Sequence, residues 1–281
     1  TPTQLNYAPA GGVSRMVVCW SDPKARERMR TEVARVARIF DTVIVDDFLF
    51  STCDDRCKRC KADKEQRKIA DWGEYARALL FEVSEQDILA VAKAANPKAR
   101  FIIKYPCWYQ TWEQRGYSPA RQAALFGECW VGTETRDKNK NPLQACWIMD
   151  HTIKLSNGAC GGGWYDALDC TPEKFVEQGY YTILGGAKES LVHCYDYILA
   201  KDPGKTPFGE KARAAEQCKQ MFEKHHAELR RLADFLQGTT RLEFKMNPNG
   251  VSEHFFLKEG RLYRARLNTR GEAVDGLAPH A

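Results

Sequence analysis

Short apolar runs alternate along the chain with longer stretches whose apolar residues recur at helical spacing. We expect strands at residues 16–20, 42–45, 100–105, 130–134, 159–164 and 190–195. The stretches with the amphipathic spacing of helices are residues 23–40, 72–95, 141–155 and 171–184. Apolar strands joined by helices indicate a parallel sheet with right-handed crossovers. The pattern therefore predicts the α/β class.

The pattern changes after Pro207. Residues 210–237 predict one long charged helix, and residues 240–267 alternate apolar and polar positions in three short strands. The turns between these strands contain Asn247-Pro248-Asn249-Gly250 and Glu259-Gly260, which favour hairpins. We expect a (β/α) barrel over residues 1–238, and a small antiparallel β appendage or the start of a truncated β-domain over residues 239–281.

The number of predicted strands limits how much of a barrel the chain can form. A complete (β/α)8 barrel has eight strand–helix units, whereas the pattern supplies six. We therefore expect a TIM-type (β/α)8 barrel that is incomplete at its N-terminus. No charged and then apolar leader follows Thr1, so the sequence shows no signal peptide and leaves the localisation open.

Composition excludes several classes of protein. The 281 residues are 43% hydrophobic and 11% aromatic, which is incompatible with disorder as the main state. The net charge is only +5, and the Lys and Arg residues are interleaved with Asp and Glu, so we expect no nucleic-acid partner. No apolar run approaches the roughly 20 residues of a membrane span. The oligomeric state stays open.

Acidic, basic and aromatic side chains gather where the predicted strands end. In a parallel barrel these ends meet on one face, which is where such enzymes place their active sites. Carboxylates there can protonate a glycosidic oxygen and attack or activate water, while aromatic rings stack on sugars. The candidate catalytic residues are Asp47, Glu134, Asp166 and Asp46. The candidate substrate-binding residues are Lys104, Tyr105, Trp108, Arg136, Trp164 and Tyr165.

Among these carboxylates, we expect Asp47 to be the general acid/base and Glu134 the nucleophile or base. Asp166 competes with them as a partner. Asp46 and Asp47 are adjacent on a strand and point to opposite faces, so only one of them can face the barrel axis. Hydrolysis of this kind requires no cofactor, and the partner would be a carbohydrate.

Several segments together resemble a family of uncharacterised bacterial proteins described as glycoside-hydrolase-like (β/α)8 barrels. They are IVDDFLFSTCDDRCKRC, VSEQDILAVAKAANPKARFIIKYPCWYQTW, GYSPARQAALF, VGTETRD and GGGWYDALDC. They keep the family's order and approximate spacing over residues 15–200. The resemblance implies a barrel and a glycan-related role. By analogy between folds, it pairs Asp47 with Asp166 or with Glu134.

The chain has eleven cysteines, an odd number, so at least one lies outside any disulfide. Cys53, Cys57 and Cys60 match the spacing that holds an iron–sulfur cluster in radical SAM enzymes, which gives one alternative function. The same three residues also suit a structural zinc, with Cys107, Cys170 or no residue as fourth ligand, or a disulfide or free thiols. Cys19, Cys129 and Cys194 lie in apolar runs, where a cysteine usually packs as a small apolar side chain.

A third class of function stays open beside the hydrolase and the radical enzyme. Carboxylates at strand ends bind sugar hydroxyls as well as they protonate glycosidic oxygens. A non-catalytic glycan-binding barrel would therefore show the same pattern of residues.

Overall fold

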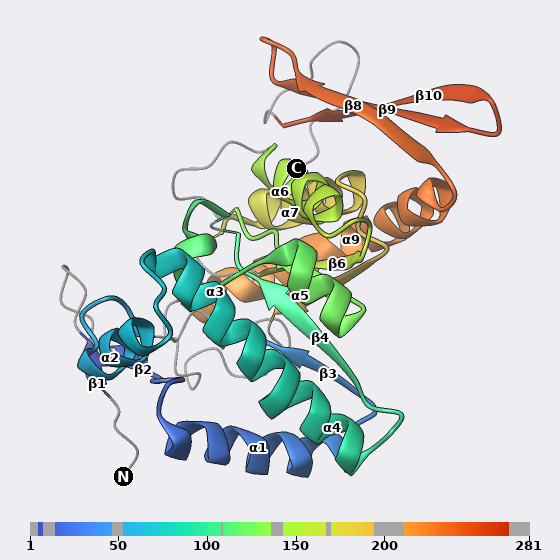
Figure 1. Cartoon of the computed structure of the whole chain (residues 1–281). Coiled ribbons are helices and arrows are strands. Elements are labelled where there is room, and N and C mark those ends of the chain that lie inside the picture. Colours follow the sequence, from blue (N-terminus) through green and yellow to red (C-terminus); the bar gives the residue numbers. More distant parts are fainter. Residues whose placement is uncertain are drawn as a thin grey trace. The chain divides into compact units, whose positions relative to one another are not determined.

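The computed structural model describes residues 5–7, 15–46, 53–107, 109–135, 143–166, 170–193 and 211–269. The chain divides into two compact units, Thr1–Trp130 with Leu155–Ala159, and Val131–Lys154 with Cys160–Ala281. Each unit is described by itself (Figure 1).

The first unit alternates strands and helices from its N-terminus. Its strands are β1 (Leu5–Tyr7), β2 (Arg15–Val17), β3 (Thr42–Val45), β4 (Arg100–Tyr105) and the start of β5 (Cys129–Gly132). Its helices are α1 (Pro23–Ala37), α2 (Lys58–Gln66), α3 (Trp72–Glu82), α4 (Ala90–Ala95) and α5 (Pro119–Phe126). A π-helical segment, η1 (Val83–Leu89), joins α3 to α4 without a break, and two short 3₁₀ helices, Tyr109–Thr111 and Glu113–Arg115, precede α5.

Side-chain caps explain where the main helices of the first unit begin. The Asp22 carboxylate accepts a hydrogen bond from Lys24 N, and Pro23 occupies the first helical position of α1. Asp71 caps α3 in the same way, through Glu74 N. The sequence pattern had indicated both helices, but α2 and α5 were missed, because the first lies in a charged Cys-rich stretch and the second is only 8 residues long.

The strand predicted at residues 16–20 does not join the parallel sheet. β2 pairs antiparallel with β1 in a separate two-stranded sheet, with Leu5 opposite Val17. The sequence predicts six parallel strands, and the prediction is wrong for the strand at residues 16–20. The chain then turns at Cys19–Asp22, through a hydrogen bond from Asp22 N to Cys19 O, and enters α1.

The second unit combines the end of the parallel sheet with an antiparallel sheet. Its elements are α6 (Gln144–Leu155), β6 (Cys160–Asp166), α7 (Pro172–Leu184), β7 (Glu189–His193), α9 (Lys211–Leu236), β8 (Thr240–Met246), β9 (Val251–Lys258) and β10 (Arg261–Asn268). β9 and β10 form a hairpin in which Lys258 lies opposite Arg261. The two residues of its turn, Glu259 and Gly260, both have positive φ, as the Glu-Gly pair predicted.

One apolar core joins the helices of the second unit to its antiparallel sheet. Tyr181 and Leu184 of α7 pack with Leu229 of α9, Phe256 of β9 and Leu267 of β10. Strands β8, β9 and β10 therefore share a core with the preceding helices. The proposed domain boundary at residue 238 stays a prediction.

The parallel sheet has five strands in the order of the sequence, β3-β4-β5-β6-β7. This is the arrangement of a half-barrel, so the α/β class is confirmed, together with a separate antiparallel sheet. The eight-stranded barrel is not found within the described residues. Among them, no helix has both the length and the apolar composition that crossing a membrane requires.

Candidate functional site

Two of the predicted catalytic carboxylates lie opposite each other at the ends of neighbouring strands. Thr133 N donates a 2.7 Å hydrogen bond to Trp164 O, and in a parallel ladder this bond places Glu134 opposite Asp166. Glu134 is 6% exposed and Asp166 is 1% exposed. Both belong to the second unit, in which the strand register fixes them side by side.

Alternation along the strands puts both carboxylates on one face of the sheet. Tyr165 packs on Phe175 of α7, and Thr133 shares a 2.6 Å hydrogen bond with Thr182 of the same helix. Side chains alternate between the two faces of a strand, so the residues next to Thr133 and Tyr165 in the sequence face away from α7. That face carries Glu134, Asp166 and the partly exposed Trp164, which is the combination of carboxylates and indole expected of a sugar site.

The side-chain amide of Gln178 separates the two strands immediately beyond these carboxylates. Gln178 Oε1 accepts a 2.8 Å hydrogen bond from Thr135 N, and Gln178 Nε2 donates one of 3.0 Å to Asp166 O. In a regular ladder Thr135 N would bond Asp166 O directly. The inserted amide replaces that bond, spreads the strand ends and satisfies both backbone groups.

Gln178 is a residue that the sequence analysis missed. The spacing of apolar residues predicts the helix at residues 171–184, but it does not indicate a role for the polar residues of that helix. Gln178 is fully buried in a helix whose buried residues are mostly apolar. A buried amide in such a place needs partners, and this was the available signal.

Glycine next to Glu134 leaves room for its carboxylate. A Cβ atom built at Gly132 would collide with the Glu134 carboxylate oxygens. The side chain of Glu134 therefore folds back along β5, over a position that only glycine can occupy without displacing it.

In the first unit, Asp46 and Lys104 form an ion pair at the ends of β3 and β4. The register of these strands, with Val45 opposite Ile103, continues to Asp46 opposite Lys104. The Lys104 ammonium donates a 2.7 Å hydrogen bond to Asp46 Oδ1. Lys104 is 4% exposed, whereas the Asp46 side chain is 51% exposed. The pair brings a buried positive charge to this end of the sheet.

The two predicted substrate-binding tyrosines are buried on the helix side of their strands. Tyr105 contacts Trp112 and Tyr117, and its hydroxyl donates to Gln122 of α5. Tyr165 packs in one apolar cluster with Phe175 and Cys170. Asp47, Trp108 and Arg136 lie outside the described residues.

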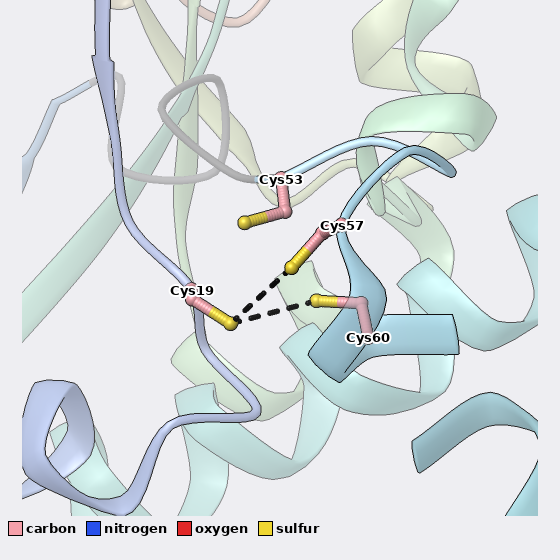
Figure 2. A group of neighbouring side chains, drawn as sticks. All are labelled: Cys19, Cys53, Cys57 and Cys60. Atoms are coloured by element: carbon pink, nitrogen blue, oxygen red, sulfur yellow. Dashed lines mark hydrogen bonds between the residues drawn. The ribbon is translucent and has the colours of Figure 1, made fainter. Parts of the chain in front are cut away.

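The three predicted metal-ligand cysteines lie together, and a fourth cysteine joins them. The sulfur atoms of Cys19, Cys53, Cys57 and Cys60 all lie within 4.8 Å of one another, as Figure 2 shows. Cys19 Sγ is 3.8 Å from Cys57 Sγ and 3.7 Å from Cys60 Sγ, and all four residues are buried. We call these four residues the cysteine cluster. It lies entirely in the first unit.

The fourth member of the cysteine cluster corrects the sequence analysis. The sequence pattern predicts that Cys19 packs as a small apolar side chain and offers Cys107, Cys170 or no residue as the fourth ligand. Neither Cys107 nor Cys170 belongs to the cluster. The sequence does not indicate this position of Cys19, because Cys19 follows an apolar strand and only the turn into α1 brings it next to the Cys-rich segment.

Electrostatics within the cysteine cluster favour the thiolate of Cys19 over those of Cys53 and Cys60. The pKa of Cys19 is lowered, because Cys53, Cys60 and Ser21 stabilise its thiolate by hydrogen bonds. The pKa values of Cys53 and Cys60 are raised, first by their hydrogen bonds with Cys19, and then by burial and by the negative charge of Cys19. A positive charge among these sulfur atoms would offset the repulsion between the thiolates of Cys19, Cys53 and Cys60.

Comparison with known proteins identifies the class to which this chain belongs. The family described as "Probable glycosyl hydrolase, catalytic domain" matches residues 6–239. The match covers most of the sequence, so the chain belongs to this family. The glycoside-hydrolase resemblance is thereby confirmed at the level of the family, and the radical SAM alternative is not favoured.

A relative adds little about function. The uncharacterized protein SSO3021 of Saccharolobus solfataricus is 26% identical over 169 residues, which cover 54% of this chain and 28% of the relative. The chain thus spans little more than a quarter of that protein's length. This relative is archaeal, so the bacterial origin implied by the resemblance is not supported.

Proposed function

We propose that this chain hydrolyses a glycosidic bond with carboxylates at the ends of its parallel strands, Glu134 serving as nucleophile or base and Asp166 as its partner. The observation that supports this proposal best is the position of Glu134 opposite Asp166, on the sheet face away from α7. Membership of the probable glycosyl hydrolase family supports a carbohydrate substrate.

The chemistry requires two carboxyl groups with different tasks. One must protonate the leaving oxygen, and the other must attack the anomeric carbon or activate water. Glu134 and Asp166 come from adjacent strands whose ends are held by Gln178, which keeps the pair in a fixed geometry. Trp164, on the same face, offers a ring on which a sugar can stack.

Asp47 competes with Asp166 for the role of general acid/base. The sequence analysis favoured Asp47, which follows Asp46 at the end of β3. Lys104, bound to Asp46, would then place a positive charge beside the substrate.

The test is a set of single substitutions assayed on a panel of glycans and aryl glycosides. Glu134→Gln, Asp166→Asn and Asp47→Asn are compared with Glu177→Gln, a buried carboxylate of α7 that pairs with Lys174 at 3.0 Å. We expect Glu134→Gln, and one of the two Asp variants, to lose hydrolysis while Glu177→Gln retains it. Glycan binding without hydrolysis in the parent protein would instead indicate a binding domain.

A further inference from the structure

The distances in the cysteine cluster match the coordination shell of one metal ion. With Zn–S bonds of about 2.3 Å, a tetrahedron of thiolates has sulfur–sulfur edges of about 3.8 Å. The two sulfur pairs with stated distances are 3.7 and 3.8 Å apart. A disulfide needs its sulfur atoms at about 2.05 Å. A cubane iron–sulfur cluster places its thiolates on separate irons, and their sulfurs lie much farther apart than ligands of one ion.

The local backbone points the cysteine cluster toward a common centre. Cys57 is the N-cap of α2, and Cys60 lies in the first turn of that helix. Cys19 approaches from the opposite side, just before the turn into α1 (Figure 2). Ser21 Oγ lies 3.2 Å from Cys19 Sγ and 3.3 Å from Cys60 Sγ, where a hydroxyl can donate to metal-bound thiolates.

The charges around α2 give a second, independent indication. Its first turn holds Lys58, Arg59 and Lys61 and no acidic residue. A helix N-terminus is already positive and disfavours cations. A divalent metal with four thiolates carries a net charge of −2. That negative charge would attract the Lys and Arg side chains and so make their position at the helix N-terminus favourable. All three cationic side chains are exposed.

We propose that Cys19, Cys53, Cys57 and Cys60 bind one zinc ion in a tetrahedral, structural site. Thiolate ligands select soft metals, and zinc binds more tightly than ferrous iron in the usual order of affinities. Four protein ligands leave no open position for a substrate, so the ion stabilises and does not catalyse. It joins the turn before α1 to the segment that follows β3, which also carries Asp46 and Asp47.

The site is tested on the intact chain by metal analysis and by mapping of protected thiols. We expect one zinc per chain after purification under reducing conditions, without iron or acid-labile sulfide. Alkylation followed by mass spectrometry should modify Cys19, Cys53, Cys57 and Cys60 only after a chelator has removed the zinc. Replacement with Co²⁺ should give the intense ligand-field and thiolate-to-cobalt bands of a tetrahedral tetrathiolate.

Cys19→Ser is the most informative variant, because Cys19 is distant in sequence from the other ligands. We expect it to lose the tetrathiolate Co²⁺ spectrum, whereas Cys129→Ser, a buried cysteine of β5, should keep it. Absence of zinc, iron with sulfide, iron alone, disulfides among the four residues, or an unchanged spectrum in Cys19→Ser would each overturn the proposal. The alkylation map of the parent decides the matter if Cys19→Ser does not fold.

Discussion

The cysteine cluster and the carboxylate pair are both buried polar groups, but their geometry differs. The four sulfur atoms converge on one point and all lie within 4.8 Å of one another. Glu134 and Asp166 instead stand side by side on adjacent strands, where two like charges are costly to bury. A convergent set of ligands is stabilised by an ion at its centre, whereas neighbouring carboxylates gain nothing from each other.

The two regions are also assembled differently. Three ligands of the cysteine cluster come from eight consecutive residues, and one turn supplies the fourth. The carboxylates are 32 positions apart in the sequence and meet only because β5 and β6 are paired in a fixed register. We therefore expect substitutions in the cluster to change stability, and substitutions in the pair to change activity.

The largest expected effect is the loss of stability when the cysteine cluster is broken. Loss of a metal site is among the few changes that cost more than about 4 kcal/mol. Cys60→Ser should lower the free energy of unfolding by at least that amount, measured by urea denaturation with zinc present. Cys129→Ser, equally buried, is the control. Equal losses in both variants would show that burial, and not metal binding, makes Cys60 important.

Glu134→Gln should show the opposite behaviour. General acid–base or nucleophilic groups contribute about 10²–10⁴-fold to rate, so we expect kcat to fall by about 10³-fold. The midpoint of thermal unfolding should stay the same or rise, because a buried negative charge is removed beside Asp166. A parent-like kcat together with a lower unfolding temperature would assign Glu134 a structural role.

The sequence predicted those parts of the fold and site that depend on neighbours in the chain. The strands at 42–45 and 100–105, the helix start at Pro23 and the turn at Glu259-Gly260 all follow from local pattern. Cys53, Cys57 and Cys60 were recognisable from their spacing alone. The glycoside-hydrolase class followed from the order of several segments.

What the sequence could not predict depends on contacts between distant residues. Nothing local to Cys19 distinguishes a ligand from a packed cysteine, and the pairing of β1 with β2 is needed to remove that strand from the parallel sheet. The role of Gln178 arises from two backbone groups, on Thr135 and Asp166, that the register leaves at the right separation. Carboxylates at strand ends were predicted, but their register was not.

Acid should lower the stability of the two units for different reasons, so the contribution of each unit can be measured separately. Burial lowers the pKa of His254, in the core of the second unit, to about 4, and the nearby Arg241 charge adds to this effect. The ring also contacts Ser252, Cys146, Phe244 and Tyr181, and none of these supplies a negative charge. The neutral imidazole is therefore the form that the folded state accepts.

Because this pKa is depressed on folding, the unfolded chain binds a proton that the folded chain does not. His254 thus contributes stability that is present above about pH 6.5 and is lost as the pH falls toward 4. At about 1.4 kcal/mol per pKa unit, the loss approaches about 3 kcal/mol. Urea denaturation between pH 7 and 4 should show a smaller decrease for His254→Gln than for the parent, while zinc release, followed separately, is equal in both. An identical decrease in the two proteins would exclude His254.

Gln178 is the smallest and most specific test, because its amide connects the stability of the second unit to its proposed chemistry. Gln178→Ala removes this partner from Thr135 N and from Asp166 O, which keeps its contact with Cys170 Sγ, and an unsatisfied buried N–H costs about 1–3 kcal/mol. Gln122→Ala is a matched control, because Gln122 is a fully buried helical glutamine of the first unit that bonds Ser118 N and Gly116 O. Both variants should lose similar stability.

Only Gln178→Ala should also lower kcat, by about 10- to 100-fold, because small displacements of reacting groups are costly in rate. The decrease should appear in kcat with little change in KM, since the amide positions carboxylates and does not touch substrate. If both variants lower kcat equally, the spread strand ends have no catalytic purpose, and the carboxylate pair is no more specialised than the rest of the core.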